Sequence, residues 1–226
     1  MAVFLAGPAA AMDVQVIEDQ IIMSGRIDTG ELPRLWEIAE ADKRAKAIRT
    51  VVLRDSAGGD LRTSLQAADF IRRQGWNTAV SGYCFSGCAL MFLGGRERGF
   101  TDDKAAARPQ LGFHGAYHVA TAIAGTQRFE PGSVSAWHTG EARRWIQRGT
   151  DGKISQAMLD RFEQLAQSDF IHFFNPAQLP RKGQVSIFVC PIVKEGGRKC
   201  EPIAGTDVFR EGIANSEVLI GSNDRR

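Results

Sequence analysis

The feature that most restricts the fold is a pattern of strand, glycine-containing turn and helix that occurs twice between residues 50 and 94. Residues 50–54 are almost wholly apolar and precede Ser56-Ala57-Gly58-Gly59. Residues 78–80, Thr-Ala-Val, are predicted to form a second strand before Gly82-Tyr83-Cys84-Phe85-Ser86-Gly87. Unbroken apolar runs are typical of strands covered on both faces, as in parallel sheets. The succession therefore predicts an α/β fold with a largely parallel sheet.

The two turns follow the strands at their carboxyl ends. In an open parallel sheet, sites form in the crevice beyond these ends. We therefore expect the glycine turn and the serine turn to share one crevice, although they are separated in the sequence.

The remaining pattern predicts further elements around this core. We expect a first hairpin, several amphipathic helices, a short helix stopped by Gly183 and a last core strand. The respective ranges are 14–17 with 20–27 for the hairpin, 32–43, 61–75, 86–93, 136–148 and 154–167 for the helices, 175–183 for the short helix and 185–189 for the strand. Residues 118–137 have no strong period and predict a long insertion, such as a lid or substrate-binding loop.

The length of 226 residues favours one sizeable domain. We expect that domain over residues 13–190, followed by a C-terminal hairpin and polar tail over 191–226. Residues 1–12 are predicted to be a signal-peptide remnant or a disordered tail. Their apolar run and small residues fit the end of a secretory signal, whereas the charged leader is missing.

The composition limits the classes of partner that the chain can bind. The chain is 43% hydrophobic and 24% charged with a net charge of +2, which argues against a polybasic nucleic-acid surface. No later stretch approaches the ~20 apolar residues that a membrane span needs. The signal-like N-terminus and the even number of cysteines favour a periplasmic or secreted protein over a cytoplasmic one.

Four cysteines, Cys84, Cys88, Cys190 and Cys200, suit an oxidising compartment. Cys190 and Cys200 flank a Gly-Gly turn signal, which predicts a hairpin closed by a disulfide. For Cys84 and Cys88, a disulfide across one turn and two reduced, buried cysteines are both compatible with the sequence. The spacings do not match a structural zinc motif, so we expect no metal site.

Ser86 is the candidate nucleophile, because a strand-to-helix turn would expose its hydroxyl near backbone N–H groups that favour negative charge. Glycine at position 87 would let a substrate approach closely. The competing interpretation is a serine that only caps the helix. Gly58 and Gly59 can aim N–H groups at one point, although a strand-to-helix turn alone could also require glycine.

His114 is the candidate general base, since it follows the apolar residues 111–113 and would end a strand near the crevice. The other histidines, His118, His138 and His172, are expected in a loop or on helical segments. A carboxylate should fix the imidazole tautomer. Asp169 is the first choice and Asp160 the second, with helix-surface charge as the competing interpretation for both.

At these residues the chain resembles the Clp-type proteolytic subunits of the crotonase-like superfamily, in particular exported relatives. Residues 21–28 are similar to the family's opening strand and loop, and residues 55–59 to its Asn-Ser-Pro-Gly-Gly turn, with Asp for Asn and Ala for Pro. Residues 82–87 take the place of the family's Gly-x-Ala-Ala-Ser-Met turn, and Phe113-His114 the place of its Ile-His. Residues 168–170 and 175–183 resemble its segment around the triad aspartate. The insertion at 118–137 and the two cysteines beside the serine depart from the pattern.

The resemblance implies a stacked β-β-α spiral, a Ser86–His114–Asp169 triad and an oxyanion hole from the N–H groups of Gly59 and Gly87, with Gly58 supporting the turn. It also implies a homo-oligomer acting on a peptide or protein, with no cofactor. We therefore predict an ATP-independent serine endopeptidase. A catalytically inactive scaffold and a crotonase-like acyl-CoA enzyme are the alternatives.

Overall fold

The structure is a computed structural model that describes residues 12–44, 47–102, 110–114, 136–165, 169–181, 183–190 and 200–221. The chain divides into two compact units. Unit 1 comprises Met1–Leu111 with Ala214–Arg226, and unit 2 comprises Gly112–Ile213. The predicted signal remnant, most of the 118–137 insertion, the turn of the C-terminal hairpin and the polar tail lie outside the described residues.

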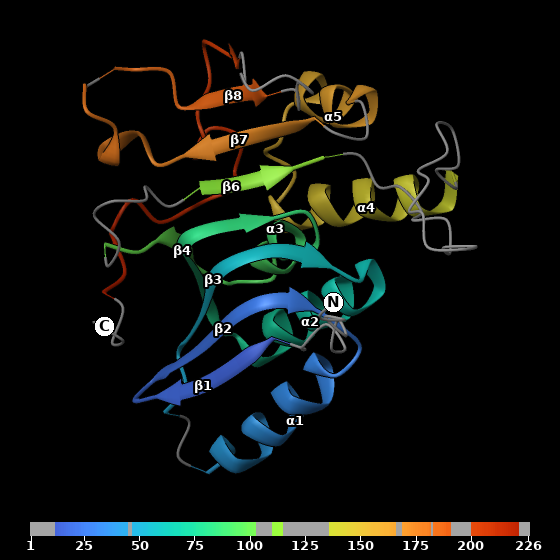
Figure 1. The fold of residues 1–226 in the computed structure, drawn as a ribbon, viewed down its shortest axis with the longest axis vertical. Helices are drawn as coiled ribbons and strands as arrows, with labels where there is room; N and C mark the ends of the chain where they lie inside the picture. The colour runs from blue at the N-terminus through green and yellow to red at the C-terminus, as the bar shows by residue number, and fades with distance from the viewer. Residues whose placement is uncertain are drawn as a thin grey trace, which may run out of the picture. The chain divides into compact units, whose positions relative to one another are not determined.

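Unit 1 is built on a mostly parallel sheet in which β1 to β4 lie side by side in chain order (Figure 1). β1 pairs with β2 in an antiparallel hairpin, while β2, β3, β4 and β5 pair in parallel. The strands are β1 (Asp13–Ile17), β2 (Gln20–Ile27), β3 (Thr50–Gly59), β4 (Asn77–Phe85) and β5 (Arg98–Phe100), and the helices are α1 (Glu31–Asp42), α2 (Leu61–Gln74) and α3 (Gly87–Phe92). The predicted α/β class with a largely parallel sheet is confirmed.

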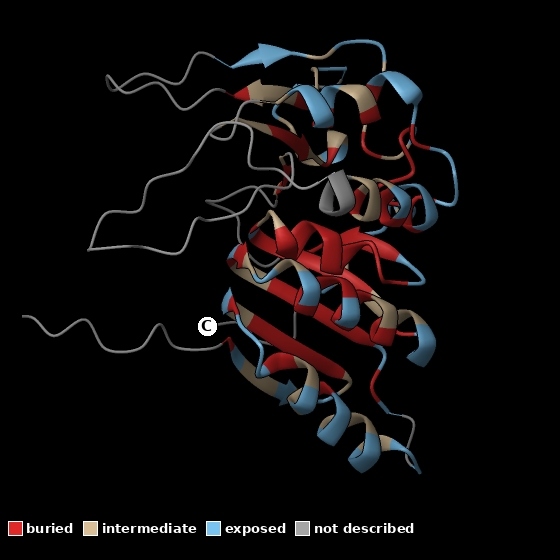
Figure 2. Cartoon of the chain, turned by 90° about the vertical axis from the view of Figure 1, so that its right-hand side faces the viewer, coloured by how far each residue is buried: buried red, intermediate tan, exposed pale blue. Residues whose placement is uncertain are grey.

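The sheet of unit 1 is buried on both faces, which explains its unbroken apolar strands. Val51, Val52 and Leu53 are 0% exposed although their side chains alternate between the two faces. Figure 2 shows this in the red strands of the sheet, whereas exposed residues are concentrated on the helices. On one face, the paired residues Ile22, Val52 and Ala79 form a cluster that Ile17 and Ile220 help to cover.

Three neighbouring strands bend at the same level, just before the two turns. Gly25 of β2, Asp55 of β3 and Gly82 of β4 have positive φ values of 100°, 45° and 72°. The pairing register shifts beside each of them. β3 therefore continues past the predicted end at residue 54 and reaches Gly59, so that the glycine turn is the bent end of the strand.

The C-terminal segment returns to unit 1 and completes the hydrogen bonding of β5. The N–H groups of Asn215 and Ser216 donate to the Arg98 carbonyl at 3.0 and 3.1 Å. The N–H of Ile220 donates to the Phe100 carbonyl at 2.9 Å, beside a bridge between Thr101 and Ile220.

Unit 2 contains an antiparallel group of strands with two main helices. β7 pairs with β8, and β8 pairs with β9. Phe113, Phe162 and Phe173 pack together with ring centroids 5.3 to 6.2 Å apart, which joins α5 to the strands. The elements are α4 (Ala136–Gly149), α5 (Gln156–Gln164), β7 (Phe170–Phe174), the 3-10 turn η1 (Pro176–Gln178), β8 (Ile187–Cys190) and β9 (Glu201–Pro202), while β6 (Gln110–Phe113) crosses the boundary between units.

Two details of unit 2 differ from the sequence prediction. β7 occupies residues where no strand was predicted, so His172 lies on a buried strand rather than in a loop or helix. The expected short helix over residues 175–183 is a 3-10 turn of three residues, capped by the Asn175 side chain. The run Phe-Ile-His-Phe-Phe forms a strand because its aromatic and β-branched side chains pack well against neighbouring strands.

Candidate active site

Ser86 occupies the junction between β4 and α3 in a conformation that side chains rarely adopt. Its φ is 57° and its ψ −125°, and the residue is half-buried. An ordinary capping residue has negative φ and accepts a hydrogen bond from an N–H of the first turn. Asp60, which caps α2, does both, with φ −59° and a bond from Thr63 N–H at 2.7 Å. Ser86 makes no capping hydrogen bond. The capping interpretation therefore does not account for it.

The glycine turn at the end of β3 lies directly against this junction. A Cβ added to Gly58 would lie 2.5 Å from the Phe85 carbonyl oxygen, 2.7 Å from Ser86 Cβ and 2.8 Å from Gly87 N. Gly58 also has φ +91°. Only glycine can occupy this position without displacing the serine turn. The two turns that the sequence separates by 28 positions are thus in contact, as expected for strand ends in one sheet.

The other two glycines of the predicted oxyanion hole are also close-packed. A Cβ on Gly87 would overlap the Ser64 hydroxyl and would lie 3.4 Å from the Gly59 carbonyl oxygen. A Cβ on Gly59 would overlap the backbone of Ile27 in β2. The Gly58 N–H donates to Ser56 Oγ at 3.2 Å. Gly58 therefore supports the turn, and Gly59 and Gly87 lie where the two turns meet.

Both cysteine pairs form disulfides. Cys84 and Cys88 bracket Ser86 with a Cα–Cα distance of 5.2 Å, and both residues are 0% exposed. Cys190 and Cys200 join the paired strands β8 and β9 with a Cα–Cα distance of 4.2 Å. The alternative of reduced cysteines at 84 and 88 is wrong. Two disulfides are typical of proteins that fold in an oxidising environment.

His114 directly follows β6, as predicted, and is half-buried in unit 2. Its ring packs edge-on against Phe170, with 4.7 Å between the ring centroids. Asp169 is the residue before Phe170 and lies half-buried at the start of β7. The structure thus places His114 beside the residue that follows the predicted triad aspartate.

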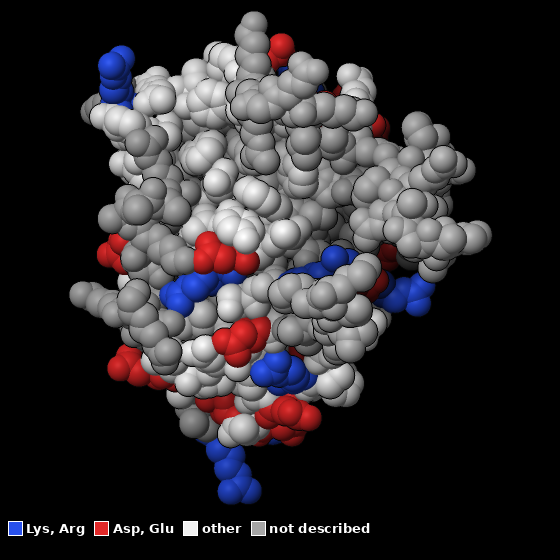
Figure 3. Space-filling model, in the orientation of Figure 1, with Lys and Arg blue, Asp and Glu red and all other residues white. Residues whose placement is uncertain are grey.

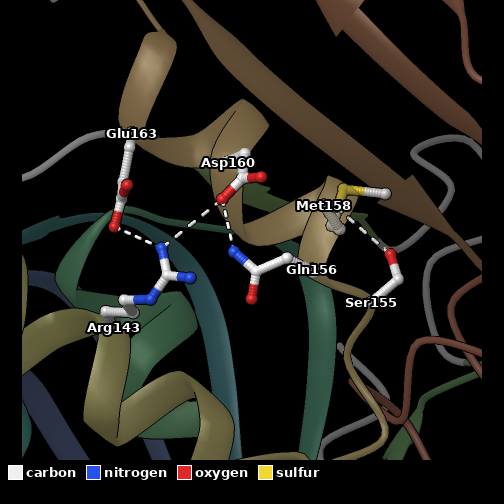
Figure 4. A network of polar contacts seen from close by, with 6 residues as sticks. All are labelled: Arg143, Ser155, Gln156, Met158, Asp160 and Glu163. Atoms are coloured by element: carbon white, nitrogen blue, oxygen red, sulfur yellow. Dashed lines mark hydrogen bonds and ion pairs between the residues drawn. The ribbon is translucent and has the colours of Figure 1, made fainter.

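Asp160, the second choice for the triad carboxylate, lies on α5 in a polar network (Figure 4). It accepts a hydrogen bond from Gln156 Nε2 at 2.5 Å and lies 3.7 Å from Arg143 Nη1 of α4. Arg143 also pairs with Glu163. The Asp160 carboxylate therefore takes part in a helix-to-helix ion-pair network.

The predicted site residues are divided between the two units. Ser86, Gly58, Gly59 and Gly87 belong to unit 1, where they lie together, and His114 and Asp169 belong to unit 2. One neighbouring feature, the aromatic pair of Tyr83 and Phe85, was not predicted from the sequence. Their ring centroids are 5.1 Å apart, and the i, i+2 spacing on β4 places both on the face opposite Cys84.

The described residues contain no group of three or more His, Cys, Asp or Glu side chains placed to hold a metal ion. None of the helices in the described ranges is long and apolar enough to cross a bilayer. On the face shown in Figure 3, acidic and basic side chains are interspersed.

Comparisons with known proteins give no family. No protein-family model and no curated protein matches the sequence. Among solved structures, the chain is similar to a mutant of the 1510-N membrane-bound stomatin-specific protease, with 12% identity, a TM-score of 0.44 and coverage of 63% of this chain and 67% of that one. It is also similar to a peptidase from Plasmodium falciparum, with 11% identity, a TM-score of 0.48 and coverage of 69% and 87%. With TM-scores below 0.5, neither likeness assigns an activity to this chain.

Proposed function

We propose that this chain is an exported, ATP-independent serine peptidase whose domain, residues 13–190, has the Clp-type, crotonase-like fold. The observation that carries the proposal is the backbone of Ser86, with φ 57° and ψ −125° at a strand-to-helix turn. A non-glycine residue in such a region costs about 1–3 kcal/mol and persists where the surroundings enforce it, commonly at active sites. The same turn geometry exposes the nucleophile of other serine hydrolases.

In the proposed reaction, Ser86 Oγ attacks a peptide carbonyl while His114 takes its proton and then passes it to the leaving amine. Asp169 fixes the tautomer of His114. The N–H groups of Gly59 and Gly87 stabilise the oxyanion, a contribution typically worth ~3 kcal/mol per donor. Water then releases the acyl group from Ser86 and regenerates the free hydroxyl.

The choice of Asp169 over Asp160 rests on the surroundings of the two carboxylates. Asp169 precedes Phe170, whose ring contacts His114. Asp160 is instead bonded to Gln156 and lies near Arg143. The contact between Phe170 and His114 therefore favours Asp169.

The two disulfides support export to the periplasm or beyond, because cytosolic reductants keep thiols reduced. Assembly into a homo-oligomer and a peptide or protein substrate are carried over from the family resemblance.

A fluorophosphonate probe, which reacts with activated serines, tests the proposal. We expect the wild-type protein to be labelled, with mass spectrometry locating the adduct on Ser86. Ser86→Ala should lose the label. Ser216→Ala, which alters a serine outside the proposed site, should keep it. Labelling that persists in Ser86→Ala would overturn the proposal, and an unlabelled wild type would favour the inactive scaffold.

A further inference from the structure

We infer that the Cys84–Cys88 disulfide is a positioning device that holds Ser86 in its positive-φ conformation. The catalytic consequence of this inference rests on the proposed function, whereas the conformational part does not. The bond closes a ring of five residues with Ser86 at its centre.

Each end of this ring is anchored in a regular element. Cys84 lies in β4, where it pairs with Ser56 of β3, and Cys88 is the second residue of α3. The disulfide therefore ties the end of a strand to the start of a helix across the serine turn. It limits the backbone rotations by which residues 85–87 could relax.

The disulfide acts together with packing on both sides of the turn. On the helix side, α3 is a short buried helix of six residues, and the Leu90 N–H donates to the Ser86 carbonyl at 3.3 Å. On the other side, the Gly58 backbone packs closely against Phe85, Ser86 and Gly87. A strained conformation persists only where its surroundings over-determine it. The disulfide adds to these contacts a covalent restraint that packing alone does not provide.

Burial distinguishes a permanent restraint from a redox switch. Thiol–disulfide exchange requires access of the attacking thiolate to a sulfur atom. Cys84 and Cys88 are 0% exposed, whereas Cys200 of the second disulfide is exposed. A dithiol should therefore open Cys190–Cys200 first. The Cys84–Cys88 bond should stay closed while the protein remains folded, and thus act as a fixed part of the site.

The first experiment compares the double variant Cys84→Ala/Cys88→Ala with the matched control Cys190→Ala/Cys200→Ala. Hydrogen exchange of the amides of residues 86–88 reports the turn directly. We expect it to be at least ~10-fold faster in the first variant and unchanged in the control. Fluorophosphonate labelling should fall by ~10- to 100-fold in the first variant alone, as expected when a reacting group is slightly misplaced.

The outcomes separate this inference from the proposed function. Unchanged exchange at residues 86–88 in Cys84→Ala/Cys88→Ala would overturn the inference, whatever the labelling. Faster exchange with a wild type that the probe does not label would support the positioning role and reject the peptidase. Equal labelling of wild type and variant would overturn the catalytic consequence while leaving the peptidase intact.

A second measurement covers the case in which the double variant fails to fold. The wild-type protein is partly reduced with dithiothreitol in urea, where both disulfides are accessible, and is then refolded by removal of the urea. Dithiothreitol breaks an S–S bond, gives two electrons and two protons to the two cysteines and closes to a cyclic disulfide. Alkylation and mass spectrometry then separate molecules with one open bond from those with two. Faster exchange at residues 86–88 only in doubly reduced molecules, with β3 still protected, supports the inference. Equal exchange in both populations overturns it.

Discussion

Ser86 has a positive φ, in a region of the Ramachandran plot that glycine adopts readily and other residues rarely adopt. Replacing it by alanine removes the hydroxyl and leaves the backbone strain. Replacing it by glycine removes both. Relief of ~1–3 kcal/mol of strain outweighs the ~0.4–1 kcal/mol by which glycine stabilises the unfolded chain. We therefore expect Ser86→Gly to have a free energy of unfolding about 1 kcal/mol higher than Ser86→Ala, measured by urea denaturation.

Both variants lack the hydroxyl, so the difference between their free energies of unfolding reports the backbone conformation and not the loss of the hydroxyl. If Ser86→Gly proved no more stable than Ser86→Ala, the conformation would not be strained.

The sequence predicted the turn and its serine correctly. It did not predict the sign of φ, because Ser-Gly before a helix is equally typical of a plain cap. It also left the state of Cys84 and Cys88 open, since the sequence does not say whether the two sulfur atoms are bonded to each other.

At the scale of elements, the bends in β3 and β4 depend on the contact between Asp55 and Gly82. A Cβ on Gly82 would overlap the Asp55 carboxylate, and Gly82 also has φ +72°. Gly75 has nearly the same φ, +70°, with nothing within 4 Å of an added Cβ. We expect Gly75→Ala to cost about 1 kcal/mol through backbone strain alone. Gly82→Ala should cost about 2–4 kcal/mol, because overlap adds to strain.

Urea denaturation of both variants checks this difference, and a double variant identifies its source. Adding Asp55→Ala to Gly82→Ala removes the carboxylate that the new methyl group meets. The double variant should therefore lose less than the sum of the two single changes. A strictly additive result would show that Asp55 is not what excludes a side chain at position 82.

Elements with a long, regular pattern were predictable, and short ones were not. The strands containing Val51 and Val80 and the helix α2 follow from unbroken apolar runs and a helical period. β5 and β9 have only three and two residues, too few for any period to be recognised. β7 was not predicted, because its five residues are too short for a clear period and the Asn-Pro-Ala after them indicates a helix start.

At the scale of the molecule, residues 214–221 complete unit 1. They supply hydrogen bonds to Arg98 and Phe100, and Ile220 covers the cluster of Ile22, Val52 and Ala79. We expect a chain that ends at Ile213 to lose at least ~3 kcal/mol of stability in unit 1, because several hydrogen bonds of about 1 kcal/mol each are lost together with apolar burial. Hydrogen exchange of the amides of β3 measures this loss of stability.

A chain that ends at Gly221 is the matched control, because it keeps every one of these contacts. It should show the exchange of the full chain. Equal protection of β3 in the two truncated chains would mean that the C-terminal segment contributes nothing to unit 1.

The sequence did not predict that the C-terminal segment returns to unit 1. The Arg98 N–H binds the Asn215 side chain across 117 positions, and no local pattern encodes such a distant partner.

The return of the C-terminal segment also has a consequence for biosynthesis. β5 lies beside β4, the strand that leads into the serine turn, and β5 is fully bonded only when residues 215–220 have arrived. A ribosome adds residues 215–220 only after it has made the whole of unit 2, Gly112–Ile213. Unit 1 therefore cannot finish folding when its first segment emerges, and the layer around the serine turn is completed only once the intervening unit has been synthesised.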